Sequence, residues 1–174
     1  MTAIDPGRQI DRARRLAEAG DLDAAAAIFA EIAADGDAPD RQEGAAGLSA
    51  VAERMAEQLL EDGEPGQAAD LLLRALSVPG VADPARLRVL LGLAHLDMAC
   101  GEFAGAVEEG VGSGEGADAG TGALAIELLA RVLPLRGRDG DAESVWRYGL
   151  AHPDAALAEE VRLRLNRDVR PSIT

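Results

Sequence analysis

"GEFAGAVEEG", residues 101–110, contains a glycine, an acidic residue, and then Phe, Ala and Val at helical spacing. Three other stretches share this pattern: GDLDAAAAIF from Gly20, GEPGQAADLL from Gly63 and GRDGDAESVW from Gly137. The four glycines are 43, 38 and 36 residues apart. A recurrence at this period is the signature of helical-hairpin repeats, so the sequence predicts an all-α fold built from them.

Each copy is explained as two helices joined by a turn at its glycine. Glycine tolerates the left-handed conformation that commonly ends a helix, and the acidic or polar residue after it suits the N-terminus of the next helix. One alanine stands seven places before each glycine. Another stands five places after it, where this second helix is expected to cross the first most closely. These alanines are Ala13, Ala56, Ala94 and Ala130 before the glycines, and Ala25, Ala68, Ala106 and Ala142 after them.

A larger side chain follows the second alanine by four places and is expected to fill the space between neighbouring helices. It is Phe29, Leu72 and Trp146 in three copies, whereas the third copy has Gly110. One hairpin cannot bury its apolar face alone, so the copies are expected to stack on one another. Trp146 is therefore predicted to lie in the core, and the third hairpin is predicted to pack less tightly.

The composition favours closely packed helices in one domain. The 174 residues are 48% hydrophobic, much of this content is alanine, and only 2% of the residues are aromatic. Small side chains let helix backbones approach one another, and alanine has the highest helix propensity. No stretch alternates apolar and polar residues over the length of a strand, so no sheet is expected. The length suits a single domain over residues 1–174.

The net charge of -14 excludes several classes of partner and site. Nucleic acids and anionic membrane surfaces are bound through cationic side chains, so neither is an expected partner. All 17 basic residues are arginine, and without lysine there is no phosphate-binding GxxxxGK loop and no Schiff-base lysine. Cys100 is the only cysteine, which precludes an internal disulfide. Neither a signal peptide nor a run of about 18 apolar residues is found, so we expect a cytoplasmic protein.

The repeated pattern resembles the tetratricopeptide repeat (TPR) family, whose unit is a helix-turn-helix with small residues at the crossing and glycine at the turn. Pro79 and Pro153 stand where that family often has a terminal proline, and the long spacing is similar to kinesin light chain-type repeats. The resemblance covers residues 6–153. It implies a right-handed α-solenoid of about four hairpins with a C-terminal capping helix. The predicted hairpins are at 6–34, 39–78, 84–112 and 122–151, and the capping helix is at 154–168.

Proline marks two predicted helix starts. Pro39 suits the first position of a long helix, and Asp83 reads as an N-cap followed by Pro84 at the first position of the next one. The helix at 84–100 is apolar nearly all round, so it is expected to be the centre of the core, with a short helix at 103–111 as its partner.

The C-terminal part contains a predicted connection and a predicted helix end. Residues 112–122 include five glycines, which is typical of a flexible connection. Pro134 is expected to bend or end the helix that begins near residue 122. In the last helix, Leu157, Val161 and Leu165 share one stripe and charges occupy the rest, as in a helix that caps a stack.

Three groups of residues contain types found in metal, nucleophilic or phosphate-binding sites, but their arrangement does not match such sites. The acidic run at 53–62 has no accompanying His or Cys, which is typical of a solvated face rather than a metal site. His95, Asp97 and Cys100 share a helix, but His95 and Asp97 point to different sides. The glycine-rich residues 110–116 follow no strand and lack lysine, so they do not fit a phosphate loop. We therefore expect no enzyme, no cofactor and no metal.

The resemblance implies a concave groove, lined by the first helices of successive hairpins, that holds a peptide or a partner's helix. Arginines in this groove would select a carboxylate-rich ligand through bidentate hydrogen bonds, and pairing with nearby glutamates inside the groove is equally expected. The candidate contacts are Arg14, Glu53, Glu57, Arg88, Leu91, His95, Glu127 and Arg131.

The leading hypothesis is a non-enzymatic adaptor or scaffold that binds another protein or a peptide. The alternative is a structural component that forms a homo-oligomer through its alanine-rich outer helices or its terminal helix. A third hypothesis, a small enzyme that uses Glu53 or Glu57, requires a bound metal. A size in solution that rises with concentration would favour the second hypothesis, whereas a monomer at every concentration would exclude it.

Overall fold

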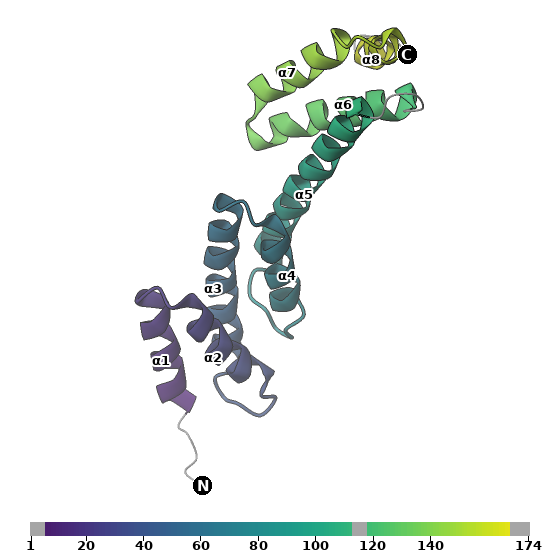
Figure 1. Ribbon diagram of the computed structural model, residues 1–174. Coiled ribbons are helices and arrows are strands. Elements are labelled where there is room, and N and C mark those ends of the chain that lie inside the picture. Colours follow the sequence, from purple (N-terminus) through teal and green to yellow (C-terminus); the bar gives the residue numbers. More distant parts are fainter. Residues whose placement is uncertain (1–5, 113–117, 168–174) are drawn as a thin grey trace. The chain divides into compact units, whose positions relative to one another are not determined.

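Residues 6–112 and 118–167 are described by the structure, a computed structural model, and every regular element within these ranges is a helix (Figure 1). The prediction of an all-α fold is confirmed. The contacts divide the chain into two compact units, Met1–His95 (unit 1) and Leu96–Thr174 (unit 2). The helices are α1 (Pro6–Glu18), α2 (Leu22–Ala34), α3 (Arg41–Glu61), α4 (Pro65–Leu76), α5 (Pro84–Gly112), α6 (Ala119–Val132), the 3-10 helix η1 (Leu133–Arg136), α7 (Asp139–Leu150) and α8 (Ala155–Arg167).

Three of the four repeated glycines form the turns that the sequence predicts. Gly20, Gly63 and Gly137 have φ values of 87°, 77° and 69°, in the left-handed region that glycine adopts without strain. Seven of the eight alanines of the repeated pattern are buried, which explains why a small residue is needed there, whereas Ala106 is half-buried. Those before the glycines expose at most 3% of their surface: Ala13, Ala56, Ala94 and Ala130.

Unit 1 packs its helices around two apolar clusters. The first joins α1, α2 and α3 around Phe29, which is 4% exposed. The second joins α3, α4 and the first part of α5 around Leu72 and Leu87, which are almost fully buried. Phe29 and Leu72 therefore fill the space between helices, as the sequence predicts.

The helices α2 and α3 meet at two glycines that the repeat pattern does not single out. A Cβ atom on Gly44 would lie 2.9 Å from Cβ of Ile32, and one on Gly47 would lie 2.6 Å from Cζ of Phe29. Both partners are buried core residues that cannot easily move aside. Glycine is required at these positions because α3 passes directly over these two side chains of α2.

Unit 2 contains the second part of α5 together with α6, η1, α7 and α8. One apolar cluster includes Cys100 and Leu133, and a second joins α6 and α8 around the fully buried Val161. The helix α6 ends directly before η1, which contains Pro134, so the predicted effect of this proline is confirmed. Trp146 is half-buried against the second cluster, at the edge of the core in which it was expected.

The predicted turn at Gly101 is wrong, because α5 is one continuous helix. The hairpin predicted at 84–112, with separate helices at 84–100 and 103–111, therefore does not form. A glycine in a helix interior costs only about 1 kcal/mol relative to alanine, which does not by itself end a helix. Each turn that does form has a residue nearby that caps or breaks a helix: Asp21, Pro65 and Pro134. Gly101 has no such residue beside it.

The helix α5 is also much less buried than its apolar sequence predicts. Val89 is 63% exposed and Met98 is 43% exposed, so the residues at 84–100 are not enclosed on all sides. The missing hairpin is the physical reason, since the predicted partner helix at 103–111 continues in line with α5 and cannot cover it. The expectation that this helix forms the centre of the core is wrong.

Two predicted boundaries differ from those in the structure. Pro39 is not the first residue of α3, which begins at Arg41 after Asp40. Of the predicted connection at 112–122, residues 113–117 lie outside the described part of the chain. Residues 119–122 are helical because Asp118 caps α6, its carboxylate accepting hydrogen bonds from two backbone N–H groups at 3.2 Å.

Exchanging single glycines for alanine tests the corrected boundary. Gly101→Ala should raise the free energy of unfolding by about 0.5–1 kcal/mol, because alanine favours a helix and nothing lies within 4 Å of the added Cβ. The matched change Gly63→Ala should lower it by about 1–2 kcal/mol, because φ is 77° at this turn. Urea denaturation followed by circular dichroism measures both, and a destabilised Gly101→Ala variant would contradict a continuous α5.

Candidate functional site

Polar contacts link α1 to α3 in unit 1, where the sequence predicts one wall of the groove. Arg14, on α1, forms an ion pair with Glu43 on α3 and lies within 3.9 Å of Asp11. Arg54, on α3, donates a hydrogen bond to the backbone oxygen of Ala17 at 3.1 Å. These side chains are exposed, so the contacts add little stability, although they align the two helices. Arg14 thus pairs with carboxylates of its own chain.

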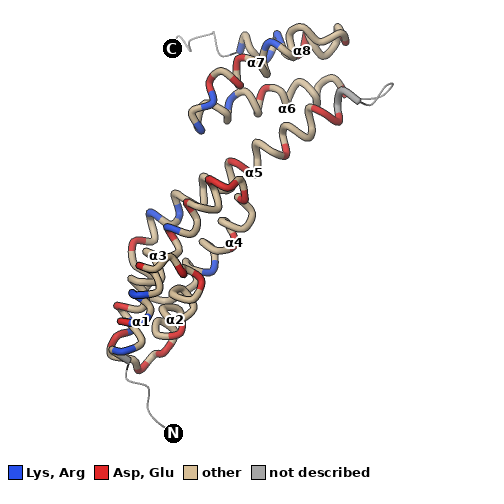
Figure 2. The backbone as a smooth tube through the Cα atoms, turned by 60° about the vertical axis from the view of Figure 1, so that its left-hand side comes forward, with Lys and Arg blue, Asp and Glu red and all other residues tan. Residues whose placement is uncertain are grey.

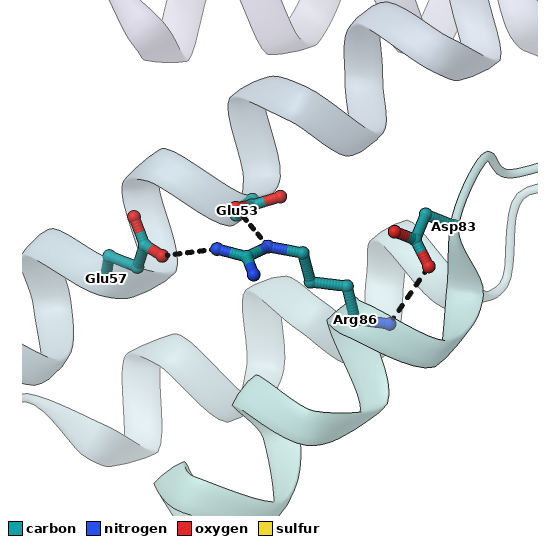
Figure 3. A network of polar contacts seen from close by, with 4 residues as sticks. All are labelled: Glu53, Glu57, Asp83 and Arg86. Atoms are coloured by element: carbon teal, nitrogen blue, oxygen red, sulfur yellow. Dashed lines mark hydrogen bonds and ion pairs between the residues drawn. The ribbon is translucent and has the colours of Figure 1, made fainter.

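Glu53, Glu57 and Arg86 form a network between α3 and α5 (Figure 3). Nε of Arg86 donates to Glu53, and Nη2 donates to Oε1 of Glu57 at 3.2 Å. The hydrogen bond to Glu53 raises the pKa of Arg86 above its ordinary value. Oδ1 of Asp83 accepts a hydrogen bond from the backbone N–H of Arg86 at 3.2 Å, which confirms the predicted N-cap of α5. Two carboxylates share one guanidinium here, so the network is net negative.

Glu127 is the centre of the polar contacts in unit 2. Its Oε1 accepts a hydrogen bond from Nη2 of Arg131, and its Oε2 accepts one from Nη1 of Arg164, both at 2.8 Å. Burial raises the pKa of Glu127, but the hydrogen bonds from Arg164 and Arg131 outweigh burial and hold this pKa below its ordinary value. Arg164 belongs to α8, so Glu127 ties the predicted capping helix to α6.

The remaining predicted contacts lie on α5. Arg88 and His95 are exposed, and Leu91 is half-buried. Among the residues that the structure describes, none forms a hydrogen bond or an ion pair with the side chain of Arg88. Figure 2 shows that α5 carries few charged residues beyond its first turns. Val89 and Met98 are exposed apolar residues of the same helix. The part of the predicted site that stays accessible is therefore an apolar helix surface with Arg88 beside it.

The residues Pro84–Glu109 of α5 are long and apolar enough to cross a membrane. This is the one such helix in the described ranges, and little of it is buried. Length and composition are weak evidence of a membrane span, since core helices can pass the same test. Asp97, within this stretch, accepts two hydrogen bonds from the guanidinium of Arg136, at 2.7 and 2.9 Å.

A polar groove of about 540 Å³ lies in unit 1 between the α1–α2 turn, α3 and α4. Its lining combines apolar side chains such as Met55, Leu59 and Leu71 with several acidic residues and one arginine, Arg74. The surplus of carboxylates disfavours an anionic ligand in this groove. The acidic lining residues are Asp21, Asp23, Asp62 and Asp70.

The polar residues of α5 do not meet at one site. His95 is exposed, Asp97 is held by Arg136, and Cys100 is buried. Burial raises the pKa of the Cys100 thiol, which disfavours the nucleophilic thiolate. In the part of the chain that the structure describes, no three His, Cys, Asp or Glu side chains are grouped as a metal site.

Comparison with protein-family models, with curated proteins and with solved structures found no match to this chain. The TPR resemblance and the adaptor role therefore stay predictions. Their support comes from the packing and the surface of the chain itself.

The sequence identified both members of the Glu127–Arg131 pair, but only one member of the ion pairs that join two helices. Arg86, Glu43 and Arg164 were not predicted, although they hold Glu53, Arg14 and Glu127. Spacing along one helix shows which residues share a face, whereas a partner on another helix depends on how the two helices are aligned. The one available signal was the predicted start of α5, which places Arg86 in the first helical turn.

Proposed function

We propose that the protein is a non-enzymatic adaptor or scaffold that binds a partner protein through the exposed side of α5. The observation that carries this proposal is that α5 is apolar yet little buried, with Val89 63% exposed. An exposed apolar surface on a chain of net charge -14 is typical of an interaction site. Arg88 is available to form a bidentate ion pair with a carboxylate of the partner.

The proposal includes a divergent TPR-like, right-handed solenoid. Its support is the left-handed glycine at three helical turns and the buried alanines before and after each of these three glycines. The hairpins that remain after the correction of α5 are α1–α2, α3–α4 and α6–α7, with α8 in the position of the capping helix. In this proposal α5 replaces a hairpin with one longer helix and so offers a wider exposed surface.

A protein partner fits α5 better than the interior of a membrane. Asp97 lies midway along Pro84–Glu109, and its carboxylate is held by Arg136. An aspartate at the centre of a membrane-spanning helix costs about 2.5–3.5 kcal/mol. A protein that covers only the exposed side of α5 would leave this ion pair in place.

Self-association is the second candidate function, and one feature of α5 favours it. Ala85, Val89, Gly92, Leu96 and Ala99 recur at alternating spacings of four and three residues, the pattern of a seam between two helices. The first three are exposed and the last two are half-buried. Nothing lies within 4 Å of a Cβ added to Gly92, so another helix would have room to approach. A second copy of α5 could therefore cover this surface.

Val89→Asp tests whether the exposed side of α5 binds a partner. With the chain immobilised, recovery of partner proteins from a cell lysate should fall at least about tenfold, since an unpaired charge in an apolar contact costs more than about 1.4 kcal/mol. The matched control is Leu73→Asp, because Leu73 is 50% exposed but belongs to α4 rather than to α5. Equal recovery with both variants would contradict the proposal.

Light scattering over a range of concentrations separates the two candidates. An adaptor should keep a constant mass in both variants and in the unchanged chain. A mass that rises with concentration in the unchanged chain and in Leu73→Asp, but not in Val89→Asp, would favour self-association through α5.

A further inference from the structure

A second surface, in unit 2, has the features of a docking groove. A groove of about 470 Å³ lies between α7 and the C-terminal part of α5. It is lined by Val107 and Glu108 from α5 and by Ser144, Val145 and Tyr148 from α7. This volume is large enough for one or two side chains of a bound peptide.

The floor of this groove is apolar and fixed in place. Val107 and Val145 both pack against the two apolar clusters of unit 2, so the shape of the groove is set by the core. The hydroxyl of Ser144 donates a hydrogen bond to the backbone oxygen of Gly140 at 2.9 Å. The hydroxyl proton of Ser144 is therefore already hydrogen-bonded within the chain and needs no acceptor from water or a ligand. An apolar side chain can thus occupy the groove at little cost in free energy.

The charge at the groove favours a positively charged ligand. Glu108 is the one charged lining residue, it is exposed, and none of the described residues forms an ion pair with it. Tyr148 is 41% exposed, and its ring makes an edge contact with His152 at 5.7 Å between ring centres. A carboxylate beside an exposed aromatic ring attracts a guanidinium or an ammonium group through an ion pair and a cation–π contact. An acidic segment would be repelled by Glu108 and by the net charge of -14.

We propose that the groove between α5 and α7 docks a peptide segment of a partner protein in which an apolar side chain stands beside an arginine or lysine. The apolar side chain lies between Val107 and Val145, and the cation lies against Glu108 and the ring of Tyr148. This inference rests on the proposed role as a binding module, but it uses a different surface from that of Val89. The two proposals can therefore fail separately.

The probe is a pair of fluorescent synthetic peptides that share the same leucines and differ in carrying arginine or glutamate between them. Anisotropy should show binding of the arginine peptide and none of the glutamate peptide. Tyr148→Ala should weaken binding about tenfold, because the apolar contact and the cation–π contact are both lost. Ser144→Arg should weaken binding of the arginine peptide at least as much, because the new side chain places a positive charge in the groove that repels the arginine of the peptide.

The control separates docking from general attraction to an acidic protein. Glu108→Gln should weaken binding about threefold, as expected for an exposed ion pair. Glu102→Gln removes the same charge from an exposed position on α5 that does not line the groove, and it should leave the affinity unchanged. Equal effects of Glu108→Gln and Glu102→Gln, equal binding of both peptides, or no binding of the arginine peptide would overturn the proposal. So would a groove that a second copy of the chain occupies, detected as dimerisation abolished by Tyr148→Ala.

Discussion

Gly47→Ala should lower the free energy of unfolding by about 3 kcal/mol. A Cβ atom at this position would lie 2.6 Å from Cζ of Phe29, far inside the normal contact distance. Phe29 is 4% exposed and packs in the cluster that joins α1, α2 and α3, so its ring has no free space to enter. Overpacking of this kind typically costs 1–3 kcal/mol, and the closeness of this contact places the expected effect at the upper end.

Urea denaturation of Gly47→Ala should be compared with that of Gly66→Ala. Gly66 lies in the first turns of α4 and has nothing within 4 Å of an added Cβ, so the same change should be neutral or stabilising there. Combining Gly47→Ala with Phe29→Leu should recover part of the loss, because the smaller side chain makes room for the methyl group. Equal stabilities of Gly47→Ala and the unchanged chain would contradict the close approach of Gly47 to the ring of Phe29.

Glu127→Gln should lower the free energy of unfolding by about 2–4 kcal/mol at neutral pH. The side chains of Glu127 and Arg164 are 12% and 16% exposed, so the arginine would keep its charge in a largely buried position without a counter-charge. Nε of Arg164 is the one buried side-chain nitrogen or oxygen atom without a hydrogen-bond partner among the described residues, which makes the remaining contacts of Arg164 more important. The loss should appear in urea denaturation, together with faster hydrogen exchange in α8.

The pH dependence of stability provides a second test of Glu127. The pKa of Glu127 is lower in the folded chain than its ordinary value of 4.5, so its contribution is fully present above that pH. The contribution is lost as the pH falls through the folded value. The unchanged chain should therefore lose more stability than Glu127→Gln when both are acidified from neutral pH. Glu159→Ala is the control, because Glu159 is 56% exposed in its pair with Arg162 and should contribute less than about 1 kcal/mol.

The repeated glycine and alanine pattern predicted most of the helices. Ala13 and Ala56 are buried at crossings, and Gly20 and Gly63 turn the chain, because these roles depend on local backbone conformation and on small size. At Gly101 the same pattern gave a wrong prediction, because the residues of the repeat are present there without a residue that caps or breaks a helix. Local sequence cannot show that a glycine is tolerated inside a longer helix when the residues before and after it both pack as part of that helix.

The candidate site was less predictable than the fold. The sequence placed Glu53 and Glu57 on one helix face, but it assigned the cation role to Arg88 rather than Arg86. These arginines are two residues apart and therefore point to different sides of α5. The groove at Tyr148 was also not predicted, because it forms between helices whose separation along the sequence gives no periodic signal.

The continuity of α5 limits how the chain can be divided into fragments. The boundary between the two units falls between His95 and Leu96, in the middle of this helix. A protease cut there would leave four N–H groups and four carbonyl groups of the helix without partners, and would expose apolar residues of both units. A fragment of either unit that is expected to fold must therefore include all of Pro84–Gly112, so the two fragments would share the same 29 residues.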